Sequence, residues 1–208
     1  KACCLVPALA LAAVLLFVVG GSLFSIRPKP KQAPVQTKDT RDEFIRFGRE
    51  FFAITRRADT ASTQAFKALE TMLQGGGSIE DVHSAFREAS TANAQASAEF
   101  KALAIPKSLQ SQSKLRQSVD TMSRSYYARK LACDILVDWG GDLNDQEIAG
   151  RYRGQVEDIN RLTREGLSYL AEAARDNGIT QDDARRFLPA AIFSEKNPFE
   201  AAGIPWGY

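Results

Sequence analysis

A heptad of apolar residues recurs in four separate stretches of the chain and limits the fold more than any other feature. In each stretch the apolar residues follow one another at alternating steps of three and four, the spacing with which neighbouring helices pack. The first of these rows, called seams below, has mostly large residues in its first half and small ones in its second: Phe44, Phe47, Phe51, Ile54, Ala58, Ala61, Ala65, Ala68 and Met72. No stretch has a convincing strand pattern, so we predict an all-α fold.

Three further seams follow along the chain. The second comprises Ile79, Val82, Phe86, Ala89, Asn93, Ala96, Phe100 and Leu103. The third comprises Gln112, Leu115, Val119, Met122, Tyr126, Arg129, Cys133 and Leu136. The fourth comprises Ile148, Tyr152, Gln155, Ile159, Leu162, Gly166, Tyr169 or Leu170, and Ala173. Four helices of similar length with short connections predict an up-down-up-down four-helix bundle over residues 41–178.

Turn and cap residues divide the seams into helices. Three glycines, Gly75–Gly77, end the first helix because glycine readily adopts left-handed dihedral angles. Ser78 begins the second helix, with Asp81 placed to complete a capping box, and Pro106 ends it.

The two remaining helices of the bundle are predicted at about 108–139 and 145–177. Either Asn144 or Asp142 is expected to cap the last of them.

An uncharged run, Ala2–Phe24, precedes the bundle. About 20 apolar residues are enough to cross the hydrocarbon core of a bilayer, so residues 1–25 are predicted to be a transmembrane anchor. A cleavable signal peptide is the alternative, but the run is longer than such a peptide needs and lacks a good cleavage site. Cys3 and Cys4, at the start of the run, are candidates for acylation or simply small apolar residues.

A linker rich in Pro and Lys is predicted over residues 26–40, because its prolines exclude a regular helix. The positive-inside rule applied to Arg27, Lys29 and Lys31 places the bundle in the cytoplasm. A basic lead, an apolar run and a Pro-rich spacer are instead typical of a bacterial signal anchor. We therefore expect a single-pass membrane protein with its bundle outside the cytoplasm, in the periplasm.

The last part of the chain, residues 179–208, is predicted to be a short helix followed by an extended tail. Thr180 and Asp183 cap the helix, which is expected over Gln181–Leu188. The tail is unusually aromatic for a solvated segment, and its candidate partner-docking residues are Phe193, Phe199, Trp206 and Tyr208. Docking on a neighbouring subunit is the favoured interpretation, with packing on the chain's own bundle as the alternative.

Composition and motifs give no sign of catalysis. The chain has a net charge of +2, one histidine and three cysteines. This balance argues against a nucleic-acid partner, and the Cys and His spacing does not suggest a zinc site. Neither a phosphate-binding loop, a Glu-x-x-His pair nor a haem attachment motif is present, so we expect no enzyme, metal or cofactor. His83 is interpreted as a surface or flanking residue.

Two polar residues interrupt the seams and are the candidate ligand or register residues, together with Tyr126. Asn93 is expected to fix the register of the helices. Arg129 either binds a carboxylate or phosphate ligand, extends outward to water, or pairs with a carboxylate of the bundle. The carboxylates considered for this pairing are Asp120, Glu99 and Glu157.

We therefore predict a non-enzymatic accessory or structural subunit of a larger membrane protein complex. Its expected partners are other membrane protein subunits and the lipid bilayer, with further copies of the chain as an additional option. An extracytoplasmic ligand-binding or sensory bundle that uses Arg129 and Asn93 is the alternative. The layout resembles membrane-anchored four-helix proteins such as chemoreceptor sensor domains and LemA-type proteins. That resemblance concerns architecture alone and implies no role for any residue.

Overall fold

The computed structural model describes residues 38–109, 111–142, 144–184 and 186–187. None of the helices within these ranges is both long and apolar enough to cross a membrane. The predicted anchor at 1–25 lies outside the described residues, as do most of the predicted linker and the aromatic tail residues Phe193, Phe199, Trp206 and Tyr208.

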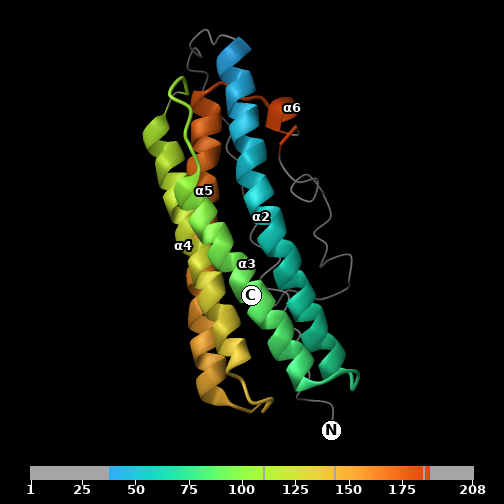
Figure 1. The fold of residues 1–208 in the computed structure, drawn as a ribbon. Helices are drawn as coiled ribbons and strands as arrows, with labels where there is room; N and C mark the ends of the chain where they lie inside the picture. The colour runs from blue at the N-terminus through green and yellow to red at the C-terminus, as the bar shows by residue number, and fades with distance from the viewer. Residues whose placement is uncertain (1–37, 110, 143, 185, 188–208) are drawn as a thin grey trace.

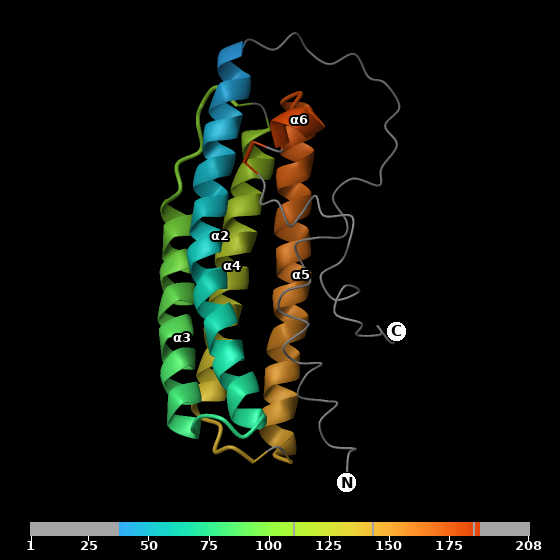
Figure 2. The same ribbon diagram turned by 90° about the vertical axis from the view of Figure 1, so that its right-hand side faces the viewer.

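Four long helices form an up-and-down bundle, and the described residues contain no strand (Figure 1). The helices are α2 (Lys38–Leu73), α3 (Ile79–Ala102), α4 (Gln112–Val137) and α5 (Gln146–Asp176), and each runs opposite to the one before it. The closest backbone approaches join α2 with α3, α3 with α4, and α4 with α5. The short helix α6 (Gln181–Ala184) follows α5 at the end of the bundle where α2 begins (Figure 2), and its Asp183 binds Arg41 near the start of α2. The all-α prediction is confirmed for this part of the chain.

Helix α2 begins earlier than predicted. Residues 38–40, the last part of the predicted linker, are helical. The last linker proline is Pro34, so nothing after it prevents the helix from extending toward the N-terminus. The seam itself is correct in its large half, where Phe44, Phe47 and Phe51 are fully buried.

The α2–α3 connection agrees with the sequence prediction. Gly75 and Gly77 have φ of +86° and +99°, which disfavours any residue with a side chain. Ser78 and Asp81 form the predicted capping box: the Ser78 Oγ accepts from the Asp81 amide at 3.1 Å, and the Asp81 carboxylate accepts from the Ser78 amide at 3.0 Å.

Helices α4 and α5 start at different residues from those expected. Helix α4 begins at Gln112 rather than near 108, and Gln112 is exposed instead of lying in the seam. A turn closed by the Leu109 amide and the Pro106 carbonyl occupies the preceding residues and buries Leu109. The cap of α5 is Asp145, whose side chain accepts from the Ile148 amide, and not Asn144 or Asp142.

Small polar residues let α4 pack closely against both of its neighbours. Ser123 donates to the Ser97 carbonyl of α3, and Ser118 donates to the Gly166 carbonyl of α5, each at 2.8 Å. A Cβ at Gly166 would lie 2.9 Å from the Met122 side chain, so the absence of one allows this approach. The apolar seam therefore describes only part of the buried surface of α4.

The end of the described chain packs on α2. Helix α6 is shorter than the predicted range 181–188, but Thr180 and Asp183 cap it as expected. Arg41 of α2 binds Asp183 at 2.5 Å. The Phe187 ring lies against the rings of Phe44 and Phe52, with centroid distances of 6.0 and 6.2 Å. Helix α6 and Phe187 together are called the C-terminal latch below.

Candidate functional site: a buried polar cluster

The bundle holds a buried polar cluster near its middle. Asp59 and Ser62 belong to α2, Asn93 to α3, and Tyr126 and Arg129 to α4. The structure thus brings together all three candidate ligand or register residues found in the sequence. It adds Asp59 and Ser62, which the apolar seam did not identify.

Arg129 is paired within the bundle. Its Nη1 donates to Asp59 Oδ1 at 2.6 Å, and its guanidinium carbon lies 4.6 Å from the centre of the Tyr126 ring. The Tyr126 hydroxyl donates to the same Asp59 oxygen at 3.1 Å. The Arg129 side chain is 5% exposed, whereas that of Asp59 is 36% exposed. Water therefore reaches the pair from the carboxylate side.

The predicted partners of Arg129 were wrong. Glu99 instead binds Arg57 at the α2–α3 surface, and Asp120 and Glu157 are exposed. Which carboxylate reaches Arg129 depends on the rotation and offset of α2 against α4, and the seam spacing does not specify either. Asp59 lies directly beside the seam residue Ala58, where small neighbours leave room for a long side chain from α4.

The charge states of the cluster follow from burial and from this pairing. Burial lowers the pKa of Arg129, but attraction to Tyr126 and Asp59 outweighs it, so the guanidinium stays protonated. Burial raises the pKa of Tyr126 well above its usual value, against the opposing effect of Arg129. Burial, with the charge of Asp134, raises the pKa of the Cys133 thiol to about 12. Cys133 is consequently a thiol at neutral pH and a poor nucleophile.

Asn93 connects three helices. Its side-chain amide donates to Ser62 Oγ at 3.0 Å and to the Ala89 carbonyl at 2.8 Å. The same nitrogen lies 3.8 Å from Cys133 Sγ on α4. Because these bonds form at only one offset of the helices, they give Asn93 the contacts that a register residue requires.

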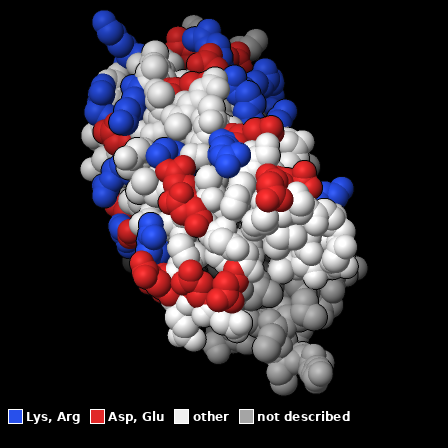
Figure 3. Space-filling view, turned by 60° about the horizontal axis from the view of Figure 1, so that its bottom comes forward, with Lys and Arg blue, Asp and Glu red and all other residues white. Residues whose placement is uncertain are grey.

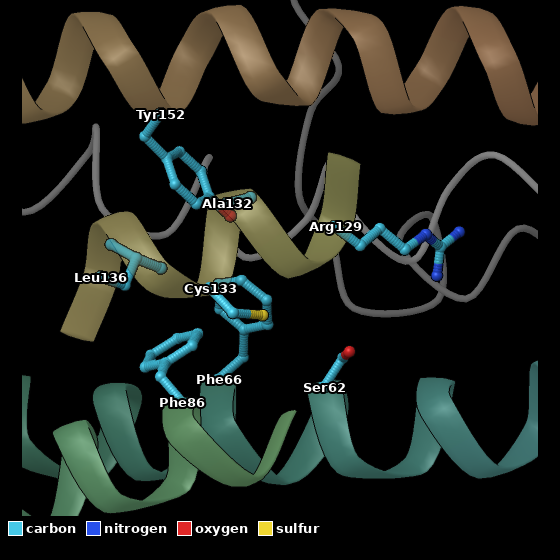
Figure 4. Close-up of a pocket in the computed structure, with 8 residues that line it drawn as sticks. All are labelled: Ser62, Phe66, Phe86, Arg129, Ala132, Cys133, Leu136 and Tyr152. Atoms are coloured by element: carbon cyan, nitrogen blue, oxygen red, sulfur yellow. The ribbon is translucent and has the colours of Figure 1, made fainter. Parts of the chain in front are cut away.

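A small cavity of about 10 Å³ lies next to the cluster. Its lining residues are Ser62, Phe66, Phe86, Arg129, Ala132, Cys133, Leu136 and Tyr152 (Figure 4). A space of this size accommodates about one water molecule. Figure 4 shows the Arg129 guanidinium extending away from the aromatic rings of the lining. Its ion-pair partner is Asp59, at 2.6 Å. This geometry favours internal pairing of Arg129 over recognition of an organic ligand.

Other candidate groups give no catalytic arrangement in the described part of the chain. His83 Nε2 lies 2.7 Å from the Trp139 carbonyl and joins α3 to the end of α4. Within the described ranges, no group of three or more His, Cys, Asp or Glu residues is placed to hold a metal ion. Tyr152 is buried in the cavity wall, and sequence reasoning identified it only as a seam residue.

Comparison with protein-family models, with curated proteins and with solved structures gives no match to this chain.

Proposed function

We propose that the chain is a non-enzymatic accessory or structural subunit of a larger membrane protein complex. The observation that supports this proposal is the internal pairing of the one buried arginine in the described bundle, Arg129, with Asp59. A bundle that pairs this buried charge internally, with a cavity of only about 10 Å³ beside it, is suited to support rather than to ligand capture. Binding of a partner subunit then depends on the outer surface of the bundle and on the aromatic tail.

The apolar run Ala2–Phe24 is the proposed membrane anchor, and the Pro-rich segment after it connects the anchor to the bundle. If the run is an uncleaved span, the chain stays in the membrane fraction after carbonate and high-salt washing. Release into the soluble fraction with a new N-terminus near Ser25 would contradict the anchor.

The aromatic tail is the proposed docking element for a partner subunit. Phe199 and Trp206 each follow a proline that stiffens an extended path, and spaced aromatic side chains suit a groove on another protein. Phe193 and Tyr208 extend this row in both directions.

The test compares the full chain with a form that lacks residues 197–208, each purified through an affinity tag in mild detergent. We expect the full chain to migrate on a native gel with a partner in fixed stoichiometry, and the truncated chain to lose it. The melting temperature of the bundle serves as the control, and the truncation should leave it nearly unchanged.

If the truncation instead lowers the melting temperature and keeps the partner, the tail packs on its own bundle. If the full chain purifies without any stoichiometric partner, the accessory-subunit proposal is wrong.

A further inference from the structure

Charged residues are distributed unequally between the two ends of the bundle. One end contains the α2–α3 and α4–α5 connections; with the helix ends that flank them, these occupy residues 71–86 and 131–150 of the sequence. These stretches have no Lys or Arg, and their acidic residues are Glu80, Asp81, Asp134, Asp138, Asp142, Asp145 and Glu147. Of these, Asp134 is paired with Lys130, which precedes the second stretch. Figure 3 brings this end forward and shows acidic side chains gathered on it. It is called the acidic end below.

The opposite end contains the α3–α4 connection, which has the reverse composition. Residues 101–116 have no Asp or Glu, and their basic residues are Lys101, Lys107, Lys114 and Arg116. The first turns of α2, at the same end, contain basic and acidic residues in equal number, so the excess of positive charge at this end comes from residues 101–116. These α2 residues are Lys38, Arg41, Arg46 and Arg49 against Asp39, Asp42, Glu43 and Glu50. This end is called the basic end.

Several carboxylates at the basic end are neutralised by their neighbours. Asp183 is bound by Arg41 at 2.5 Å. Lys114 bridges Glu172 at 3.1 Å and Asp176 at 2.9 Å. Lys101 and Lys107 are exposed and take part in none of these pairs.

The position of the chain's N-terminal segment adds a second, independent argument. Helix α2 starts at the basic end, so the segment that leads back to the proposed anchor, Ala2–Phe24, leaves the bundle there. Helix α2 has 36 residues, which corresponds to a length of about 54 Å. The acidic end is thus about 50 Å farther along the bundle from the attachment point.

We propose that the basic end of the bundle rests on the anionic phospholipid head groups of the membrane that holds the anchor, with the acidic end directed away from it. This inference depends on the anchor of the proposed function. Lys and Arg near a bilayer are attracted by anionic lipids over about a Debye length, and a row of acids is repelled by them. The tether and the charge asymmetry therefore favour the same upright orientation.

The experiment uses the full chain reconstituted into vesicles of phosphatidylcholine, with or without about 30% phosphatidylserine. A membrane-impermeant acetylating reagent then modifies the lysines of outward-facing bundles, and mass spectrometry measures the rate at each site. Lys101 and Lys107 report on the basic end, and Lys67, near the far end of α2, is the matched control. We expect acetylation of Lys101 and Lys107 to slow several-fold in the anionic vesicles alone, with Lys67 unchanged. About 0.5 M salt should remove the difference.

A variant with Lys101→Glu and Lys107→Glu keeps the anchor but removes charge from the basic end. We expect the reagent to modify Lys114 equally fast in both kinds of vesicle for this variant, whereas Lys67→Glu should leave the lipid dependence intact. Acetylation of Lys101 and Lys107 that is equally fast in anionic and neutral vesicles, with the chain firmly inserted, would overturn the inference and leave the anchor standing. A chain that fails to float with the vesicles after carbonate washing would overturn the anchor itself, and with it the basis of the inference.

Discussion

The ring of Phe187 lies so close to Gly48 that a Cβ at position 48 would come within 2.6 Å of it. Gly48 is therefore the residue that gives the C-terminal latch its contact surface on α2. The contact joins the last described residue of the chain to α2, the first described helix. It covers a row of α2 that the main seam does not include. Ile45 and Phe52 lie in that row and are only 2% exposed.

Replacing Gly48 by Ala should destabilise the chain, because the new methyl group displaces Phe187 from α2. Lost burial of a Phe side chain costs about 2–3 kcal/mol, and the higher helix propensity of Ala returns about 1 kcal/mol. We expect a net loss of about 1–2 kcal/mol in the free energy of unfolding, measured by urea denaturation of the detergent-solubilised chain.

The same substitution in a Phe187→Ala background is the control for this mechanism. With the ring gone, only helix propensity remains, so Gly48→Ala should then stabilise the chain by about 1 kcal/mol. Destabilisation of equal size in both backgrounds would show that Phe187 does not pack on Gly48.

The latch also marks the limit of what the sequence predicts about the fold. A period of 3.5 identifies Phe44, Phe47 and Phe51 as core, because large apolar residues at that spacing line one face of a helix and must be buried together. It does not identify Phe52, because that residue is buried at the α2 surface where Phe187 packs, and Phe187 is remote in sequence. Contacts between distant segments leave no local periodic signal.

In the polar cluster, too, the sequence predicts some residues and misses others. Asn93 and Arg129 are visible in the sequence because they interrupt apolar rows. Asp59 and Ser62 are not, because polar residues beside a seam are normal on any helix. Small residues such as Ser118 and Ser123 pass unnoticed for the same reason, although they are buried in the contacts of α4.

Removal of Asp59 should be costly, since it leaves the Arg129 charge buried without its carboxylate. For Asp59→Ala we expect a loss of about 2–4 kcal/mol in the free energy of unfolding, below the upper range for fully buried pairs because Asp59 is partly exposed. The matched control is Glu99→Ala, which breaks the surface pair with Arg57 and should cost at most about 1 kcal/mol. Equal losses from the two variants would contradict a special role for the buried pair.

The seam phase itself is tested at Phe51, which is fully buried and lies 4.9 Å from the Phe100 ring. Phe51→Ala should cost about 3–5 kcal/mol through lost contacts and the cavity it leaves. Arg57→Ala, on the exposed face of the same helix, removes only the surface pair with Glu99 and should cost at most about 1 kcal/mol. Similar shifts in melting temperature for both would show that the helix face has been assigned wrongly.

Acid should weaken the C-terminal latch. Burial raises the pKa of Asp183, but hydrogen bonds from Arg41 and Thr180 outweigh it, so the folded-state pKa lies below the usual value. A depressed pKa means that the carboxylate stabilises the fold above its unfolded-state pKa of about 4, and that this contribution is lost as the pH falls through the folded value. Asp183→Asn should therefore weaken the latch at pH 7 and make little difference at about pH 2.

Hydrogen exchange at the backbone amides of Ala184 and Phe187 measures this effect, because both amides donate hydrogen bonds in this part of the chain. A difference between wild type and variant that stays constant from pH 7 to about pH 2, after correction for intrinsic exchange, would show that the Asp183 charge does not hold the latch.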